Sequence, residues 1–246
     1  MASREQAWSQ QQLQAPHEVA DKAGRVRCMF NAIAPRYELV NTVFSFGCDK
    51  MWRRRAVRLA EVRSDDDVLD IACGTGDFAR AFAAANPASV VGCDFATEML
   101  ALASKRPPPS ITWCEADALC LPFDDQAFSI TSCAFGVRNF QDLRKGFGEM
   151  HRVLRSGGRA VILEFTRPRH RLFRAMYELY ANRFMPVAAS IISGDRSGAY
   201  RYLPRSVVSF PDSQKVTDIL KEVGFSRVEA TPLTLGVVVI YIARRD

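Results

Sequence analysis

Gly74 and Gly76 stand directly after a short apolar segment, within the stretch 70–77 (DIACGTGD). Glycine lets the backbone turn tightly and approach a bound ligand closely. Asp94 follows Gly74 by twenty residues, and Asp117 follows a later apolar segment. A carboxylate at that distance from a glycine loop is typical of a ribose-binding acid. The pattern therefore predicts a site for a cofactor that contains a nucleoside.

Two of the acids favour S-adenosylmethionine over a nicotinamide dinucleotide. Asp70 lies inside the end of the apolar segment, four residues before Gly74, where dinucleotide enzymes carry apolar residues. A carboxylate there can act on the cationic methionine end, and Asp117 can accept a hydrogen bond from the adenine amino group. A pyrophosphate site avoids such carboxylates, whereas a sulfonium ligand with an ammonium group tolerates them. Thr75 is a further candidate contact.

Alternating strands and helices would bring these residues to one edge of a sheet. The predicted strands are 67–72, 90–94, 111–115, 128–133 and 160–164, and the predicted helices are 78–85, 96–105, 141–155 and 214–223. Such alternation is typical of a parallel sheet with helices on both faces. Two final strands, 227–231 and 237–243, are too close in sequence for a parallel crossover. We predict an α/β fold: a doubly wound, mostly parallel, seven-stranded Rossmann-like methyltransferase sheet with a C-terminal antiparallel hairpin.

Two segments fall outside this alternation. Apolar residues recur at helical spacing over 26–44, interrupted by Pro35, and again over 51–62, which predicts broken helices that form a flap. Residues from about 166 to 210 are basic, aromatic and helical in pattern, as expected of an insert. We divide the chain into a polar lead at 1–24, expected to be frayed, a helical flap at 25–64, and a methyltransferase domain at 65–246.

The net charge of +6 is unevenly distributed. Residues 25–63 carry nine basic and three acidic side chains, and 151–210 carry eleven and three, whereas 64–150 carry six and thirteen. The acidic centre suits a cationic cofactor, and the basic segments suit an anionic surface. Hydrophobic residues at 48% and charged residues at 24% exclude disordered, collagen-like, coiled-coil and disulfide-rich classes.

Neither a metal centre nor a covalent nucleophile is indicated. The seven cysteines include no CxxC pair, and the three histidines are scattered. We therefore expect reduced thiols and a metal-independent, non-covalent mechanism. The first seventeen residues hold no signal-peptide core, and the longest apolar run, 233–243, is about half of a membrane span. These features predict a cytoplasmic protein that at most associates peripherally with the inner membrane surface.

Seven stretches stand out along the chain: 36–41 (RYELVN), 45–52 (SFGCDKMW), 70–77 (DIACGTGD), 135–139 (FGVRN), 152–158 (RVLRSGG), 163–165 (LEF) and 200–203 (YRYL). Together they resemble the ubiquinone/menaquinone biosynthesis C-methyltransferases, a UbiE-type class I family, from about Val26 to Ala243. The glycine loop occurs in many methyltransferases, whereas the FGVRN, N-terminal and YRYL stretches are specific to this family.

The resemblance implies an S-adenosylmethionine-dependent C-methyltransferase that acts on a polyprenylated quinol, demethylmenaquinol or 2-polyprenyl-6-methoxy-1,4-benzoquinol. The cofactor contacts expected from the motifs and the resemblance together are Asp70, Gly74, Thr75, Gly76, Asp94, Asp117 and Ala118. The departures from the family pattern are Ala134 for a usual Ser, Asp49 for a His, Glu38 for an Asp, and Ser156 for a Pro.

Arg138 and Asn139 are the catalytic candidates that the resemblance places at the reacting ring. Methyl transfer to a ring carbon needs an aligned methyl group, an electron-rich ring and an acceptor for the released proton. Because the pKa of an arginine exceeds 12, Arg138 is a poor base, and it is better suited to stabilise a developing phenolate while water takes the proton. The alternative is a buried, structural Arg138 that pairs with Asp142.

The flap and the segment after the insert supply candidates to cover the ring. They are Tyr37, Asn41, Trp52, Tyr200 and Tyr202. A polyprenyl tail stays in the bilayer, so the resemblance also implies an anionic membrane surface as a partner. Basic residues near such a surface each contribute about 1 kcal/mol. A homodimer or a complex of quinone-biosynthesis enzymes is compatible with the sequence, and no nucleic acid is expected as a partner.

Three alternatives stay open at this stage. The first is an S-adenosylmethionine methyltransferase for another small or lipid acceptor, against which the FGVRN stretch argues. The second, from a different class, is an NAD(P)-binding oxidoreductase. The third is a nucleic-acid-binding protein, suggested by an isoelectric point near 9.1 but lacking any RNA-binding module.

Overall fold

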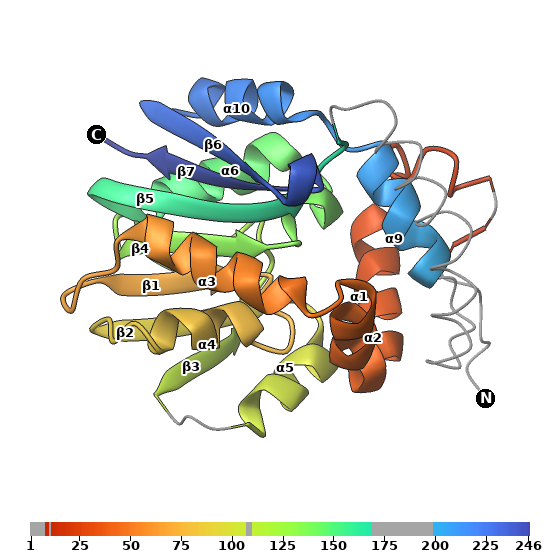
Figure 1. The fold of residues 1–246 in the computed structure, drawn as a ribbon, viewed down its shortest axis with the longest axis horizontal. Helices are drawn as coiled ribbons and strands as arrows, with labels where there is room; N and C mark the ends of the chain where they lie inside the picture. Colours follow the sequence, from red (N-terminus) through yellow and green to blue (C-terminus); the bar gives the residue numbers. More distant parts are fainter. Residues whose placement is uncertain (1–7, 10, 107–109, 169–198) are drawn as a thin grey trace.

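The computed structural model describes residues 8–9, 11–106, 110–168 and 199–246. Its centre is a seven-stranded sheet in the order β3-β2-β1-β4-β5-β7-β6 (Figure 1). The strands are β1 (Asp67–Ile71), β2 (Ser89–Asp94), β3 (Ile111–Glu115), β4 (Phe128–Ala134), β5 (Leu154–Phe165), β6 (Arg227–Leu233) and β7 (Val238–Arg244). Neighbouring strands are parallel, except that β7 is antiparallel to both β5 and β6. The predicted sheet and its C-terminal hairpin are confirmed.

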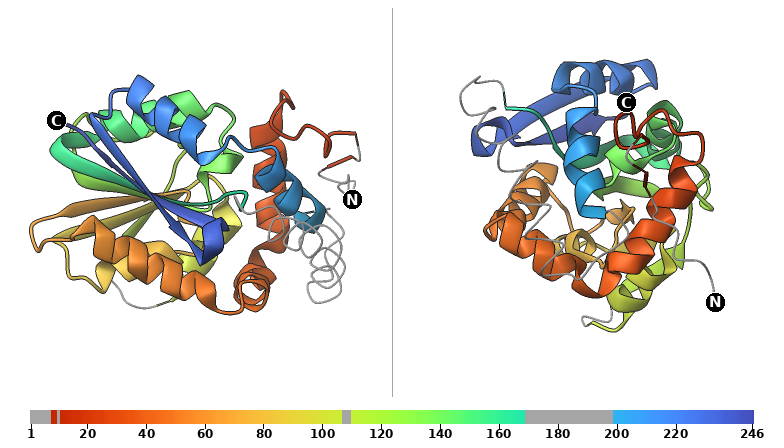
Figure 2. Two further views of the ribbon diagram at one scale, coloured as in Figure 1. Left: turned by 45° about the horizontal axis from the view of Figure 1, so that its top comes forward. Right: turned by 90° about the vertical axis from the view of Figure 1, so that its right-hand side faces the viewer.

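Helices cover both faces of the sheet because its central strands are apolar on both sides. One face packs against α3 (Cys48–Ala60) and α4 (Asp77–Ala83), with Trp52 and Phe82 in the shared core. The other face packs against α6 (Leu143–Arg152) and α10 (Ser213–Glu222). Figure 2 shows the two layers of helices from the side. Neither layer covers the carboxyl ends of the parallel strands, where a site can therefore lie.

A third group of helices lies beyond the carboxyl ends of the parallel strands (Figure 1). It comprises α1 (Lys22–Ile33), the 3-10 turn η1 (Ala34–Arg36), α2 (Tyr37–Phe44) and α9 (Ala199–Val208), and it packs against α5 (Thr97–Ser104), which also contacts β2 and β3. Pro35 lies in η1, where the sequence predicts the break between helices. Most of the predicted insert, residues 169–198, lies outside the described residues.

The described residues of the polar lead pack against this helical group. The indole of Trp8 is buried and stacks on the ring of Tyr202, with 4.3 Å between the ring centroids. Leu13 is also buried. The expected fraying was therefore wrong for these residues, because one aromatic ring in a Gln-rich segment is enough to anchor it when a matching surface is available.

The segment around Gly157 and Gly158 also differs from the prediction. We predicted one helix over 141–155 that these glycines end, but α6 ends at Arg152 and β5 already begins at Leu154. The glycines lie inside β5, where its pairing with β4 shifts register between Phe128 and Ile130. A Cβ on Gly158 would lie 2.8 Å from the carbonyl oxygen of Arg155, so the irregular backbone requires glycine there.

Candidate active site

Three adjoining cavities lie where the parallel strands end. The Asp94 cavity has a volume of about 680 Å³, the Asp70 cavity about 350 Å³ and the Arg138 cavity about 850 Å³, each including its opening to solvent. Each takes its name from a residue that lines only that cavity. Tyr37 lines all three. The cavities therefore meet at the start of α2, where a ligand spanning two of them would face a ligand in the third.

Asp94 closes the glycine loop onto the end of β2. Its Oδ2 accepts a hydrogen bond from the backbone N–H of Gly74 at 2.8 Å, and its Oδ1 accepts one from Ala96 at 2.8 Å. Burial raises the pKa of Asp94 to about 6, although these backbone N–H groups oppose the shift. Each carboxylate oxygen can still accept one more hydrogen bond, which suits the two hydroxyl groups of a ribose.

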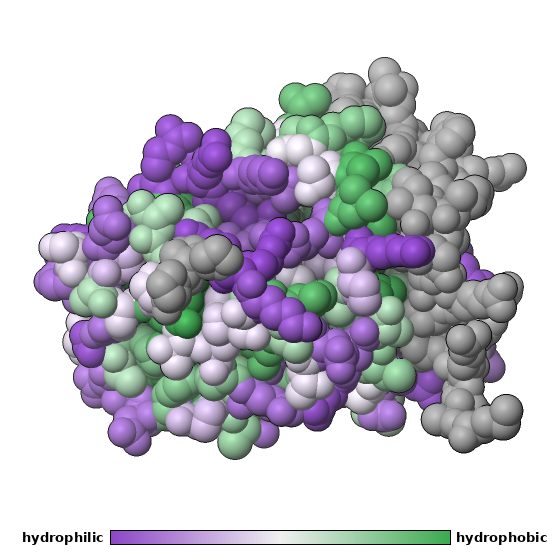
Figure 3. All heavy atoms as spheres, turned by 90° about the horizontal axis from the view of Figure 1, so that it is seen from below, coloured by the Kyte–Doolittle hydropathy of each residue, from purple (hydrophilic) through white to green (hydrophobic). Residues whose placement is uncertain are grey.

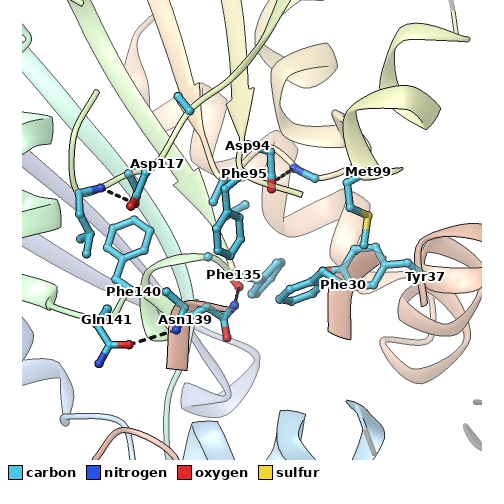
Figure 4. A pocket seen from close by; sticks show the side chains of 18 residues that line it. Phe30, Tyr37, Asp94, Phe95, Met99, Asp117, Phe135, Asn139, Phe140 and Gln141 are labelled. Atoms are coloured by element: carbon cyan, nitrogen blue, oxygen red, sulfur yellow. Dashed lines mark hydrogen bonds between the residues drawn. The ribbon is translucent and has the colours of Figure 1, made fainter. Parts of the chain in front are cut away.

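The rest of the Asp94 cavity is built for a flat ring (Figure 4). Phe95, Met99 and Phe140 supply apolar surface, and Asp117 lies at its edge together with Ala118. The Oδ1 of Asp117 accepts a hydrogen bond from the backbone N–H of Leu119 at 2.9 Å. An apolar slot with one carboxylate at its rim matches an adenine ring with an exocyclic amino group.

The Asp70 cavity holds a buried carboxylate oxygen that lacks a partner. Ser132 donates its hydroxyl to Oδ1 of Asp70 at 2.7 Å, whereas Oδ2 has no hydrogen-bond partner among the described residues. Burial raises the pKa of Asp70 to about 7. Thr75 and Gly74 line the same cavity. An ammonium group would satisfy the orphaned oxygen, so the site fits a cationic amino-acid end and would repel a pyrophosphate.

Gly76 determines the backbone conformation of the glycine loop and does not line any of these cavities. It has a φ of +85°, and a Cβ there would lie 2.3 Å from the indole of Trp113. Its place in the glycine loop thus allows close packing on β3, which in turn holds Gly74 in position.

The pKa of Asp70 leads to a prediction about the ligand-free protein. Between about pH 4 and pH 7, the folded state keeps a proton on Asp70 that the unfolded state loses, so this residue lowers the free energy of unfolding as the pH rises through that window. Asp94 acts in the same direction up to about pH 6. We expect Asp70→Asn to gain stability relative to the native chain between pH 5 and pH 8, measured by denaturant unfolding.

The difference in the free energy of unfolding between Asp70→Asn and the native chain isolates the effect of Asp70 from groups whose contribution changes with pH in the opposite direction. His17 has a pKa lowered to about 4 by burial, so it raises stability with pH up to its ordinary value near 6.5. That contribution is common to both proteins and cancels. A stability difference that does not change between pH 5 and pH 8 would contradict a buried, protonated Asp70.

Arg138 is buried in a network at the end of β4. Its Nη1 bonds to Oε1 of Glu164 at 2.8 Å and to the carbonyl oxygen of Phe135, and its Nε donates to Oγ of Ser206 at 3.3 Å. Burial lowers the pKa of Arg138, but the interactions with Glu164, Tyr37 and Tyr202 together outweigh that effect and raise it. The alternative, a pairing of Arg138 with Asp142, is wrong: the partner of Arg138 is Glu164. Asp142 instead caps α6 by accepting a hydrogen bond from the N–H of Lys145.

Asn139 does not share the cavity of Arg138. It lines the Asp94 cavity, and its Oδ1 accepts a hydrogen bond from the hydroxyl of Tyr202 at 2.9 Å. Lys22 donates to the carbonyl oxygens of Arg138 and Phe140. The lead and α9 thus hold the FGVRN segment, whose two polar side chains serve neighbouring cavities.

The predicted ring-covering residues divide into two groups. Tyr37, Asn41 and Trp52 line the Arg138 cavity. Tyr202 does not: it is buried between Trp8 and Asn139. Tyr200 lies in α9, but its side chain lies outside the described residues.

Several residues at the site were missed by the sequence analysis. Arg53 and Asp49 line the Arg138 cavity as an ion pair, with 2.6 Å between Nη1 and Oδ2. Glu164 lies in the LEF stretch that carries the family resemblance, but nothing in the sequence pairs it with Arg138. The spacing of Asp49 and Arg53 by four residues on a predicted helix was a usable signal for their contact.

Within the described ranges, no group of three or more His, Cys, Asp or Glu side chains is arranged to hold a metal ion. None of the described helices combines the length and the apolar character that a membrane crossing requires.

Comparisons with known proteins agree with this geometry. Residues 18–245 match the model of the ubiE/COQ5 methyltransferase family. The chain is 46% identical over 221 residues to the demethylmenaquinone methyltransferase of Thermus thermophilus, covering 88% of this chain and all of that relative. It is 41% identical to the ubiquinone/menaquinone biosynthesis C-methyltransferase UbiE of Geobacter sulfurreducens, covering 93% of this chain and 91% of the relative.

The fold is also shared with more distant solved structures. A SAM-dependent methyltransferase of Thermotoga maritima superposes with a TM-score of 0.62 at 16% identity, covering 89% of this chain and 98% of the other. A methyltransferase of Haloferax volcanii, solved with its Trm112 activator, gives a TM-score of 0.65 at 14% identity, covering 87% and 96%. The family match argues against the oxidoreductase and nucleic-acid-binding alternatives. The chain is an S-adenosylmethionine-dependent methyltransferase of the ubiE/COQ5 family.

Proposed function

We propose that the protein methylates a ring carbon of a polyprenylated quinol, with the ring in the Arg138 cavity. The observation that carries this proposal is the composition of that cavity. Trp52, Phe135, Phe165 and Val207 supply a largely apolar lining, and Arg138 adds a buried cation. An aromatic ring with one ionised oxygen and an isoprenoid chain matches such a lining.

The cofactor would span the other two cavities. We propose that the Asp94 cavity holds the adenosine part of S-adenosylmethionine and that the Asp70 cavity holds its methionine part. When bound, the cofactor supplies an electrophilic methyl group. Because Tyr37 lines all three cavities, the sulfonium would lie close to the mouth of the Arg138 cavity, which is the arrangement that transfer in line with the bond requires.

Arg138 would stabilise the ring oxygen as negative charge develops on it. The described hydrogen bonds of its guanidinium use three of five N–H groups, which leaves the pair on Nη2 for a ring oxygen. Burial raises the pKa of Tyr37, so this phenol stays protonated and can donate to the same oxygen but cannot act as the base. Water would then accept the ring proton, as expected from the poor basicity of both groups.

The test is an assay with labelled methyl donor and two acceptors, demethylmenaquinol and 2-polyprenyl-6-methoxy-1,4-benzoquinol. We expect the naphthoquinol to be the better acceptor, since the relatives from Thermus thermophilus and Deinococcus radiodurans, at 46% and 43% identity, are named demethylmenaquinone methyltransferases. Label in neither ring, with S-adenosylhomocysteine still bound, would rule out the proposed acceptor class and leave the cofactor assignment standing.

We also propose that the flap docks on an anionic membrane. The exposed large hydrophobic residues of the described chain lie on α2, on the turn to α3, in the first turn of α3 and on the turn η4 (Thr234–Gly236): Leu39, Val43, Phe46, Met51 and Leu235. Their neighbours Phe44, Ser45, Trp52 and Val237 line the Arg138 cavity. The basic residues Lys50, Arg54, Arg55 and Arg58 are exposed on α3 beside them.

An apolar edge with basic neighbours suits a surface of anionic lipids, from which a prenyl tail could enter the cavity. Figure 3 shows that hydrophobic and hydrophilic residues are mixed over the face seen from below.

Phe46→Glu combined with Leu235→Glu should weaken binding to anionic liposomes at least 10-fold, because Phe46 is 81% and Leu235 75% exposed and both lose the apolar area that would enter the membrane. Flotation or co-sedimentation at low salt measures the effect. The matched control is Gln126→Glu with Gln214→Glu, which adds the same charge at exposed positions elsewhere. Equal loss in both double variants would mean that only net charge matters, and the docking surface would be withdrawn.

A further inference from the structure

The Asp70 cavity contains a second buried charged group, Arg53, which lies outside the seven stretches that carry the family resemblance. Arg53 belongs to α3, and it lines the cavity together with Thr75 of the glycine loop. Its residue exposure is only 8%. Its Nε is buried and has no hydrogen-bond partner among the described residues. An unsatisfied donor on a buried guanidinium is as costly as the unsatisfied acceptor on Asp70, so both require an explanation.

The two orphaned atoms have opposite character, and the residues that carry them line one cavity. Oδ2 of Asp70 can accept a hydrogen bond, and Nε of Arg53 can donate one. The charge of Arg53 acts on Asp70, since it opposes the rise of the pKa of that carboxyl. A ligand that satisfies both atoms must present a cationic donor and an anionic acceptor within a small volume. An α-amino acid in its zwitterionic form has both, because its ammonium and carboxylate groups are bonded to the same carbon.

Arg53 is also held firmly in place. Its Nη1 donates to Oδ2 of Asp49 at 2.6 Å, and Ser45 donates its hydroxyl to the other oxygen, Oδ1, at 2.9 Å. The guanidinium lies over the ring of Phe135, 5.6 Å from its centroid. These contacts fix the plane of the guanidinium before a ligand arrives, which lowers the entropy cost of a hydrogen bond to a carboxylate.

We propose that Arg53 binds the α-carboxylate of the methionine part of S-adenosylmethionine, with Asp70 opposite it for the α-ammonium group. This inference rests on the proposed placement of the cofactor and adds a residue on α3 to it. Asp49, which stands where the family pattern has a histidine, is then a positioning residue, because it orients Arg53 without touching the cofactor itself. The flap thereby contributes to cofactor binding as well as to the acceptor cavity.

Titration calorimetry with three ligands tests the proposal. S-adenosylhomocysteine carries the whole amino-acid end, its decarboxylated analogue lacks only the carboxylate, and 5′-methylthioadenosine lacks both charged groups. For Arg53→Gln we expect about 10- to 100-fold weaker binding of S-adenosylhomocysteine, as for loss of a charged hydrogen bond, and unchanged binding of the other two. Arg53→Lys should recover part of the loss.

Arg63→Gln is the matched control, since Arg63 lies just past the end of α3 and is exposed. It should leave all three affinities unchanged. If Arg53→Gln is poorly folded because it leaves Asp49 unpaired, Asp49→Asn with Arg53→Gln removes both charges and should show the same discrimination between ligands.

Two results would overturn the inference. Equal weakening of all three ligands would show that Arg53 only supports the fold of the cavity. Arg53 also lines the Arg138 cavity, so unchanged binding of S-adenosylhomocysteine together with a raised KM for the quinol would show that Arg53 serves the acceptor and not the cofactor. Failure of the native chain to bind S-adenosylhomocysteine would be a different result, since it would reject the cofactor placement on which the inference rests.

Discussion

Replacement of Arg138 by alanine is expected to lower methyl transfer about 100-fold or more and to destabilise the fold by about 3–5 kcal/mol. The loss of activity follows from the missing donor to the ring oxygen. The loss of stability follows from Glu164, whose side chain is 1% exposed and would be left as a buried, unpaired carboxylate. Turnover with quinol and labelled donor measures the first effect, and denaturant unfolding measures the second.

A second substitution separates the two effects. Arg138→Ala with Glu164→Gln removes both charges, so much of the lost stability should return, whereas turnover should stay low because no cation faces the ring. Glu164→Gln alone keeps a hydrogen-bond acceptor for the guanidinium and serves as the matched control. If the double variant recovered stability and turnover together, Arg138 would be a structural residue, and the proposed stabilisation of a phenolate would be wrong.

The fold could be predicted from the sequence because its determinants are local. The end of β1 and the start of α4 are marked by apolar residues that change to glycine, and the short connection between β6 and β7 excludes a parallel crossover. The boundary at Arg152 could not be predicted in the same way. There the strand signal of β5 depends on its pairing with β4 across a register shift, which is a property of two segments and not of one.

The same distinction applies to the candidate site. Asp94 ends β2 and Asp117 follows β3, the neighbouring parallel strand, so their proximity could be expected from position alone. The pairing of Arg138 with Glu164 joins β5 to the segment that follows β4, and local pattern favoured Asp142, which is closer in sequence. The burial of Trp8 against Tyr202 joins segments almost 200 residues apart. Such contacts become visible only once the whole chain is folded.

Substitution of Asp94 should have the largest effect on cofactor binding. In the proposed placement, each oxygen of Asp94 accepts one backbone N–H and one ribose hydroxyl, and hydrogen bonds to a charged group contribute about 1.5–3 kcal/mol each. Asp94→Ala removes both ribose bonds and releases Gly74 from the loop. We therefore expect the dissociation constant of S-adenosylhomocysteine, measured by calorimetry, to rise about 100-fold or more.

Asp117→Ala is the matched control for this substitution. Asp117 is exposed, accepts one backbone N–H and would contact the adenine amino group only, so its loss should weaken binding about 10-fold or less. Asp94→Asn should fall between the two, since it keeps the shape of the side chain but sets an amide N–H against the N–H of Gly74 or of Ala96. Circular dichroism should show an intact fold in all three. The loss of two hydrogen bonds to a carboxylate must weaken binding far more than threefold. A rise of the dissociation constant by less than threefold for Asp94→Ala would therefore contradict the ribose contact.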